Sequence, residues 1–256
     1  MGPDVSVVEY AIAAGIGHIT LNRPERMNAV TIELARHLER ALNELSSNPT
    51  VDVILLRGNG GNFCAGGDVA EVERLRSEGP DRLRTLFDAF RQACDVIATT
   101  EVPVVAAVEG VAMAGGFELM QAADIVLVSD DAKIADNHIN FGMIPGGGST
   151  QRLPRLVGHQ IALGLLLSGD RLSGQDAVRL GLVYRSFAPN DFDDEVTHFV
   201  SQLAGRDRPA VTTIKKLVRD ARTRSLSEGL DDEIAAVVAH VTRRGVDEFS
   251  RVGKSS

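Results

Sequence analysis

Two adjacent glycines, Gly115 and Gly116, connect an apolar run to a stretch with helical character that carries one carboxylate, Glu118. The apolar run, residues 102–108, predicts a short buried strand. We therefore expect a strand-to-helix turn, where unpaired backbone amides and the positive end of a helix converge. Such a turn suits an anionic oxygen, and Glu118 lies within one helical turn of it. An oxyanion binder beside a base predicts chemistry on a carbonyl compound.

Strand and helix patterns alternate over the first part of the chain. The predicted strands fall at residues 5–21 (two strands around Gly15 and Gly17), 51–56, 102–108, 125–128 and 132–135, and the predicted helices at residues 31–45 and 83–97. Beyond residue 156 helical stripes dominate, with one brief extended piece at residues 183–187. The pattern predicts an α/β core followed by a helical C-terminal region. Those helices must bury their apolar stripes on their own core or on another subunit.

The charge balance limits the classes of partner. The 256 residues include 27 Lys and Arg against 35 Asp and Glu, a net charge of −8, which argues against nucleic-acid binding. A phosphate-bearing small ligand held by a few local cations remains compatible with it. Cys64 and Cys94 are too few for a disulfide framework, and no apolar run approaches the roughly 18 residues of a membrane span. The first residues lack the pattern of a signal peptide, so we expect a cytoplasmic protein.

A second glycine turn lies in residues 62–68, after a predicted strand. One interpretation is an ordinary turn in which Asp68 caps the following segment. The functional interpretation is a second amide donor, the N–H of Gly67. Two such donors aimed at one oxygen favour an enolate, and losing one typically costs about 3 kcal/mol of activation free energy.

Glu118 and His138 are the candidate proton-transfer groups. Glu118 can be explained as a carboxylate favoured near a helix N-terminus, but its apolar neighbours indicate a dry pocket that would raise its pKa toward that of a useful base. A lone histidine is more often structural than catalytic. His138, however, lies in a polar segment just before a glycine-rich stretch, and a histidine can pass a proton in either direction near neutral pH. Asp136 either orients the ring or is a turn residue.

Other chemistries lack their motifs. The runs at 58–61 and 146–148 have neither the Walker lysine nor the full dinucleotide fingerprint. The sequence contains no His-Glu-x-x-His motif, no Cys-rich cluster and no Gly-x-Ser-x-Gly elbow. We therefore expect no metal, no nucleotide cofactor and no serine-hydrolase site.

Taken together, the segments resemble the crotonase superfamily, the enoyl-CoA hydratase/isomerase family. The resemblance covers nearly the whole chain and rests on motifs in the family's order: Asn22–Ala29, Phe63–Asp68, Glu109–Glu118, Ala123–Ile125 and Ile144–Leu153.

The resemblance implies a fold and an assembly. The expected fold is an α/β, crotonase-like spiral of ββα units, residues 1–195, with a C-terminal helical region, residues 196–256, for oligomerisation and closure over CoA. The expected assembly is a homotrimer or a homohexamer built as a dimer of trimers.

The resemblance also implies an acyl-CoA thioester as substrate, with CoA as part of the substrate rather than as a separate cofactor. Its carbonyl would lie between the amides of Gly67 and Gly115, and the substrate-binding residues would be Ala65, Gly67, Asp68, Val69, Ala70 and Gly115. Glu118 falls on the glutamate that activates water for addition to C3 of the enoyl thioester. Phe249 and Lys254 resemble the tail that closes over CoA, and Lys215 and Lys216 are candidates for contacts with its phosphates. Taken singly, each of the three lysines is better explained as part of a solvated basic face.

One position departs from the family pattern. Counted back from Pro145, the second catalytic glutamate falls on His138. With Glu118 and His138 as catalytic residues, hydration of a trans-2-enoyl-CoA stays possible, because histidine can donate the C2 proton. The alternatives are an isomerase, hydrolase or decarboxylase that uses the same enolate, and an acyl-CoA-binding protein without turnover.

Overall fold

The computed structural model describes residues 6–243. The strands are β1 Val8–Ala13, β2 Ile16–Leu21, β3 Val53–Gly58, β4 Val104–Val108, β5 Val111–Met113, β6 Ile125–Ser129, β7 Lys133–Ala135 and β8 Arg185–Phe187. The α-helices are α1 Ile32–Ser47, α2 Val69–Ser77, α3 Pro80–Thr99, α4 Gly115–Met120, α5 Ser149–Val157, α6 His159–Ser168, α7 Gly174–Arg179, α8 Phe192–Ala204, α9 Arg208–Asp220 and α10 Leu226–Arg243. Two 3-10 helices, η1 Pro24–Arg26 and η2 His138–Phe141, complete the described part of the chain.

One six-stranded sheet organises the first unit. Its strand order is β1-β2-β3-β4-β6-β8; β1 runs antiparallel to β2, and the other neighbours are parallel. A separate parallel pair joins β5 to β7. Each parallel step needs a crossover, so the alternating pattern of the sequence follows directly from this topology. The α/β fold expected from the sequence is confirmed.

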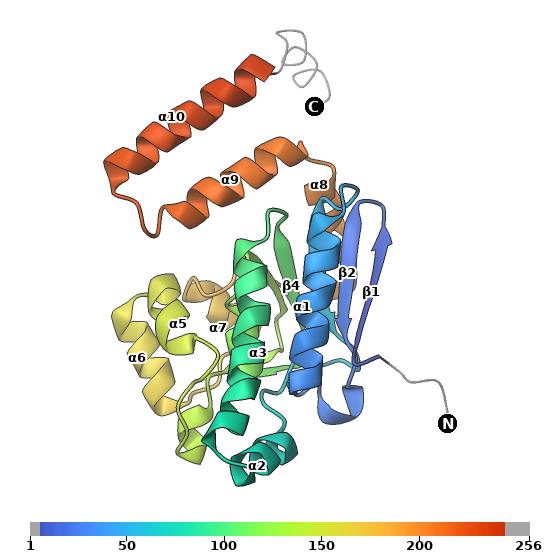
Figure 1. Cartoon of the computed structure of the whole chain (residues 1–256), viewed down its shortest axis with the longest axis vertical. Coiled ribbons are helices and arrows are strands. Elements are labelled where there is room, and N and C mark those ends of the chain that lie inside the picture. Colours follow the sequence, from blue (N-terminus) through green and yellow to red (C-terminus); the bar gives the residue numbers. More distant parts are fainter. Residues whose placement is uncertain (1–5, 244–256) are drawn as a thin grey trace. The chain divides into compact units, whose positions relative to one another are not determined.

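The side chains of the large sheet alternate between two cores. In β3, Ile54 and Leu56 face the layer of α1 and α3, whereas Val53 and Leu55 face α8. The helices α1 and α3 run side by side across the sheet (Figure 1). Because side chains of a strand point to opposite faces in turn, strands covered on both sides become continuously apolar.

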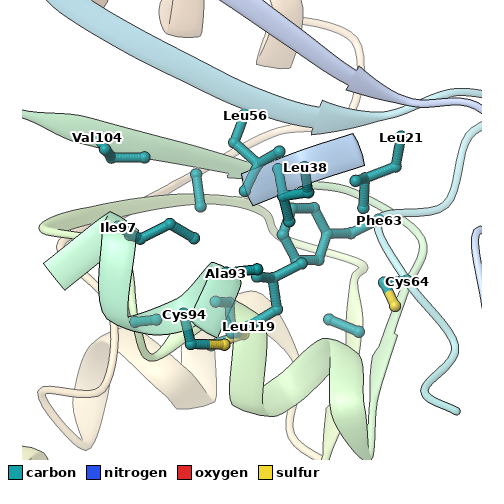
Figure 2. Close-up of a cluster of buried hydrophobic side chains, with 14 of the residues drawn as sticks. Leu21, Leu38, Leu56, Phe63, Cys64, Ala93, Cys94, Ile97, Val104 and Leu119 are labelled. Carbon is teal, nitrogen blue, oxygen red and sulfur yellow. The ribbon is translucent and has the colours of Figure 1, made fainter. Parts of the chain in front are cut away.

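Helix α1 shows how the local sequence sets an element. Thr31 caps it by accepting a hydrogen bond from the Leu34 amide at 3.1 Å. The predicted stripe of leucines at 34, 38, 42 and 45 is fully buried. Figure 2 shows Leu38 in the same cluster as Phe63 and Leu119, so the core extends beneath the loop and the helix that carry the candidate site residues.

The strand pattern differs from the expectation at one place. The prediction placed residues 102–108 directly before the glycine pair, but β5 lies between β4 and α4. Because β5 has only three residues and pairs in a different sheet from β4, its periodicity could not be distinguished from the adjoining loop. Helix α4 itself begins at Gly115.

The chain forms two compact units, residues 1–204 and residues 205–256. Helix α8 belongs to the first unit, where Phe192, Val196 and Val200 pack on the sheet. The boundary expected after residue 195 therefore falls inside α8. The described part of the second unit consists of α9 and α10, which contact each other.

Candidate active site

The turn at Gly67 is fixed on both sides by one residue. The Val30 amide donates to the Gly66 carbonyl at 2.7 Å, and the Asp68 amide donates to the Val30 carbonyl at 2.9 Å. Gly66 has a φ of +110°, a conformation that favours glycine. Within residues 6–243 the amide of Gly67 donates to no acceptor. The loop therefore holds one unpaired N–H in a defined place.

The turn at Gly115 is built in a similar way. Ala114 has a φ of +47° and a ψ of −115°, a sparsely populated conformation that costs a non-glycine residue about 1–3 kcal/mol. Its amide donates to the Ala135 carbonyl in β7 at 3.0 Å, which fixes the turn. The next amide, that of Gly115, also has no hydrogen-bond acceptor in the described part of the chain.

These two turns are in contact. A methyl group added at Gly115 would lie 3.5 Å from the Gly67 nitrogen, and one added at Gly66 would lie 3.3 Å from the Gly115 nitrogen. Two unpaired amides from separate loops thus lie side by side. That proximity is the geometric requirement for both to donate to one oxygen.

Glu118 is buried beside the second turn. Its residue surface is only 2% exposed, and its Oε1 accepts hydrogen bonds from the amides of Gly147 at 2.7 Å and Ser149 at 3.2 Å. Burial raises the pKa of Glu118, although the two amides and the nearby His138 oppose this shift. The other oxygen, Oε2, accepts no hydrogen bond from residues 6–243. The arrangement leaves one carboxylate oxygen available to take a proton.

Two side chains hold the loop that binds Glu118. Arg152 Nη1 donates to the Gly147 carbonyl at 2.5 Å, and Gln121 Nε2 donates to Ser149 Oγ at 3.0 Å. Sequence reasoning recognised the Gly146–Gly148 run as a motif but missed its amides as partners of Glu118. Nothing in the sequence indicated that Gln121 and Arg152 hold this loop, because neither residue belongs to a recognisable motif for that role.

His138 begins η2 and contacts a second carboxylate. Its Nδ1 lies 2.6 Å from Oδ1 of Asp136, whose side chain is 1% exposed, against 13% for the histidine. Burial lowers the pKa of His138, but the hydrogen bond and charge of Asp136, with the charge of Glu118, outweigh it and raise the pKa overall. The charges of Glu118 and His138 thus act on each other. The site therefore contains a buried carboxylate and an imidazole, each with a raised pKa, whose charges interact.

The expected CoA-binding segment surrounds the Gly67 turn. The Ala65 amide donates to the Met27 carbonyl at 2.9 Å, and Val69 and Ala70 are exposed at the start of α2. Asp68 caps α2 and pairs with Arg23 at 2.9 Å. Burial acts to raise the pKa of Asp68, but Arg23 and the Glu71 amide hold it below its usual value. The carboxylate is therefore engaged within the protein, and Arg23 is a contributor that the sequence did not single out.

Both cysteine side chains are buried. Burial raises the pKa of both Cys64 and Cys94 to about 12, so neither thiol is a nucleophile at neutral pH. Lys215 and Lys216 lie on α9, in the second unit. Phe249 and Lys254 lie outside the described residues.

The described part of the chain has neither a cluster of metal-ligating side chains nor a membrane-spanning helix. Between residues 6 and 243, three or more His, Cys, Asp or Glu side chains nowhere gather in a way that could hold a metal ion. No helix in that range combines the length and apolar character needed to cross a bilayer.

The fold and this pairing of amides with a buried glutamate define an α/β protein with a site suited to a polarised carbonyl. The family model for enoyl-CoA hydratase/isomerase matches residues 11–251. The chain belongs to the enoyl-CoA hydratase/isomerase family, a family of enzymes with the crotonase fold.

Individual relatives carry both activity names. The chain is 33% identical over 237 residues to a peroxisomal Delta(3,5)-Delta(2,4)-dienoyl-CoA isomerase of Arabidopsis thaliana, covering 89% of this chain and 85% of the relative. It is 35% identical over 215 residues to a probable enoyl-CoA hydratase of Rhizobium meliloti, covering 84% and 82%. The crystal structure of an enoyl-CoA hydratase from Bacillus anthracis superposes with a TM-score of 0.89 at 26% identity, covering 96% and 95% of the two chains. An acyl-CoA substrate fits this family, and the relatives' names divide between hydratase and isomerase.

Proposed function

We propose that the protein is an enoyl-CoA hydratase that adds water across the double bond of a trans-2-enoyl-CoA. The observation that carries the proposal is the setting of Glu118: one oxygen is held by two amides, the other is unengaged, and the unpaired amides of Gly67 and Gly115 are close by. A base fixed next to two converging donors suits a reaction that passes through an enolate.

The proposed reaction divides the work between two groups. The thioester oxygen accepts hydrogen bonds from the amides of Gly67 and Gly115, which makes C3 electrophilic. Glu118 removes a proton from water as the water oxygen bonds to C3, and the C2=C3 π electrons move to form the enolate. His138 then donates a proton to C2 as the carbonyl re-forms. In sum, one water molecule is added to the substrate, Glu118 has gained a proton and His138 has lost one. Transfer of a proton from Glu118 to His138 restores the starting state of the enzyme.

The proposal extends to substrate binding and assembly. Ala65, Asp68, Val69 and Ala70 would lie along CoA, and the chemistry needs no cofactor beyond the CoA of the substrate. We also infer a homotrimer or homohexamer, because α9 and α10 carry large apolar side chains that are exposed in the single chain: Ile214, Val218, Leu226, Leu230, Ile234, Val237, Val238 and Val241. A cytoplasmic location completes the proposal, and the two unpaired, buried cysteines agree with a reducing compartment.

The test is hydration of trans-2-enoyl-CoA thioesters by the purified protein. With crotonyl-CoA and longer homologues, we expect loss of the absorbance of the conjugated thioester and formation of the 3-hydroxyacyl-CoA. Glu118→Gln serves as the control for contaminating activity. Absence of turnover with every chain length would refute the proposal.

An isomerase is the second candidate. It is favoured by the similarity to a peroxisomal dienoyl-CoA isomerase. His138, at the position where the family resemblance places a second glutamate, departs from the pattern of both activities. With a 3,5-dienoyl-CoA, an isomerase would produce the absorbance of a conjugated 2,4-dienoyl thioester without adding water. His138→Glu separates the two candidates, because a gain in hydration would show that the histidine serves a different reaction.

A further inference from the structure

We propose that Asp136 is a positioning residue that fixes the orientation and tautomer of His138, so that Nε2 is the ring atom that exchanges the proton. The inference rests on the proposed catalytic role of His138 and adds a residue that does not itself reach the substrate. The observation that supports it is the buried carboxylate of Asp136 next to the ring.

The placement of Asp136 is unfavourable without a partner. Its side chain is 1% exposed, and its Oδ2 has no hydrogen-bond partner among residues 6–243. Removing a carboxylate from water carries a large desolvation cost unless another charge or hydrogen bonds offset it. Within residues 6–243, the shortest contact of this carboxylate is the one from Oδ1 to His138 Nδ1, at 2.6 Å. The ring is therefore the group that makes this burial tolerable.

The same contact determines which nitrogen carries the proton. An ionised carboxylate has only acceptors, so Nδ1 must be the donor at this distance. In the neutral ring Nε2 is then without its hydrogen, and in the charged ring Nε2 holds the proton that can leave. The His138 backbone amide also lies 3.4 Å from the same Oδ1, so ring and backbone are tied to one oxygen.

Two carboxylates act on the ring from different elements. Asp136 belongs to the segment after β7, and Glu118 comes from α4; in the described part of the chain these are the charged groups that influence His138. Both favour the charged imidazolium, against the effect of burial. Removing the charge of Asp136 leaves Glu118 alone to oppose burial, so the ring should lose its proton at lower pH.

A purely structural role for Asp136 predicts something else. As a turn residue that accepts a backbone hydrogen bond, it would contribute to stability but not to the titration of the ring. The variant Asp136→Asn keeps the shape and a possible acceptor while it removes the charge. Asp170→Asn is the matched control, because Asp170 is exposed and its carboxylate makes no hydrogen bond or ion pair within residues 6–243.

The first experiment needs no activity. Nitrogen-15 NMR of the wild-type protein, with the His138 signals assigned by their loss in His138→Gln, should show the tautomer with the proton on Nδ1. In Asp136→Asn the titration midpoint of His138 should move to lower pH, and in Asp170→Asn it should stay. A proton on Nε2 in the neutral wild-type ring, or an unmoved midpoint in Asp136→Asn, would overturn the inference even if the enzyme hydrates enoyl-CoA as proposed.

The second experiment reads the effect on turnover. A general acid contributes about 10²–10⁴-fold, and the variant keeps a weakened one, so kcat of Asp136→Asn should fall about tenfold or more while KM stays within about twofold. The basic limb of the pH–rate profile should move to lower pH. In the His138→Gln background Asp136→Asn should have no further effect on kcat; an independent, multiplicative loss there would contradict the inference. If Asp136→Asn does not fold, the wild-type tautomer decides it.

Discussion

The two halves of the candidate site are held in different ways. In the glutamate half, Glu118 on α4 is oriented by two backbone amides, those of Gly147 and Ser149. In the histidine half, His138 on η2 is oriented by the side chain of Asp136. The residue surface of Glu118 is 2% exposed, whereas the side chain of His138 is 13% exposed.

The orientation of Glu118 is therefore determined by the backbone of the fold, whereas the orientation of His138 is determined by one neighbouring side chain. Apart from substitution by proline, which lacks the N–H, a side-chain substitution leaves a backbone amide in place, so the glutamate half changes mainly when the chain around it moves. The histidine half depends on a single carboxylate and is partly open to solvent. We expect the glutamate half to be the more demanding of the two, and the following predictions test that comparison.

The largest effect is expected from Glu118→Gln. The amide keeps the size of the side chain but cannot accept a proton, and a buried base has no solvent substitute. We expect kcat to fall about 10³- to 10⁴-fold, the upper part of the range for a general base. Substrate affinity, measured by equilibrium binding, should change little; a kcat within tenfold of wild type would show that Glu118 is not the base.

His138→Gln should cost less than Glu118→Gln. Because the imidazole is partly exposed, water can replace part of its proton donation, and we expect kcat to fall about 10²-fold. The two variants should be compared under identical conditions at saturating substrate. A larger loss in His138→Gln than in Glu118→Gln would reverse the comparison.

Gly116→Ala should disturb the glutamate half through the backbone. A methyl group there would lie 1.9 Å from the Cys64 carbonyl oxygen, so α4 or the Gly67 loop must shift. We expect the free energy of unfolding to fall by roughly 1–3 kcal/mol. The control is Gly164→Ala in α6, where an added methyl group meets nothing within 4 Å and helix propensity favours alanine by about 0.5–1 kcal/mol. Equal stability of the two variants in denaturant titrations would show that α4 is not tightly held.

The pH dependence of kcat/KM should reflect both halves. The base acts when deprotonated, so the raised pKa of Glu118 moves the acidic limb above its ordinary value of 4.5. The acid acts when protonated, so the raised pKa of His138 moves the basic limb above 6.5. The whole profile should thus lie at higher pH than two unperturbed groups would give. A basic limb below pH 6.5 would contradict protonated His138 as the donor.

The smallest effect is expected from Ala114→Gly. Glycine adopts the positive φ of this position without strain, but it also gains freedom in the unfolded chain. We expect a gain of about 0.5 kcal/mol in the free energy of unfolding. Ala14→Gly, at a φ of +50° in the turn between β1 and β2, should give a similar gain away from the site. Destabilisation by Ala114→Gly alone would show that its methyl group supports the turn.

The sequence predicted the elements that are long enough to show a clear hydrophobic pattern and the loops that carry recognisable motifs. The leucine stripe of α1 and the apolar strands β3 and β4 follow directly from the pattern. Strand β5 was missed because three residues carry no usable period. The proximity of Gly67 and Gly115 was expected from two similar turns and from the family resemblance rather than from any spacing.

The contacts that orient the site could not be predicted in the same way. The bonds from Gly147 and Ser149 to Glu118 join residues about thirty positions apart, and the bridge from Arg23 to Asp68 joins residues 45 apart. Such pairs depend on how loops meet in three dimensions. Asp136 is a different case, because it lies only two residues from His138. The sequence allowed two interpretations, a turn residue or a carboxylate that orients the ring, and the same residue in the same place fits both.

The anchoring of the two glycine turns has a consequence for synthesis of the protein. The first turn needs Val30, the second needs Ala135, and Glu118 needs Ser149. A growing chain that has emerged only as far as β6 therefore holds both glycines and the Val30 contacts of the first turn, but lacks the Ala135 contact of the second turn and the Ser149 contact of Glu118. The contacts that orient the site are therefore complete only once residue 149 has been synthesised, after more than half of the chain.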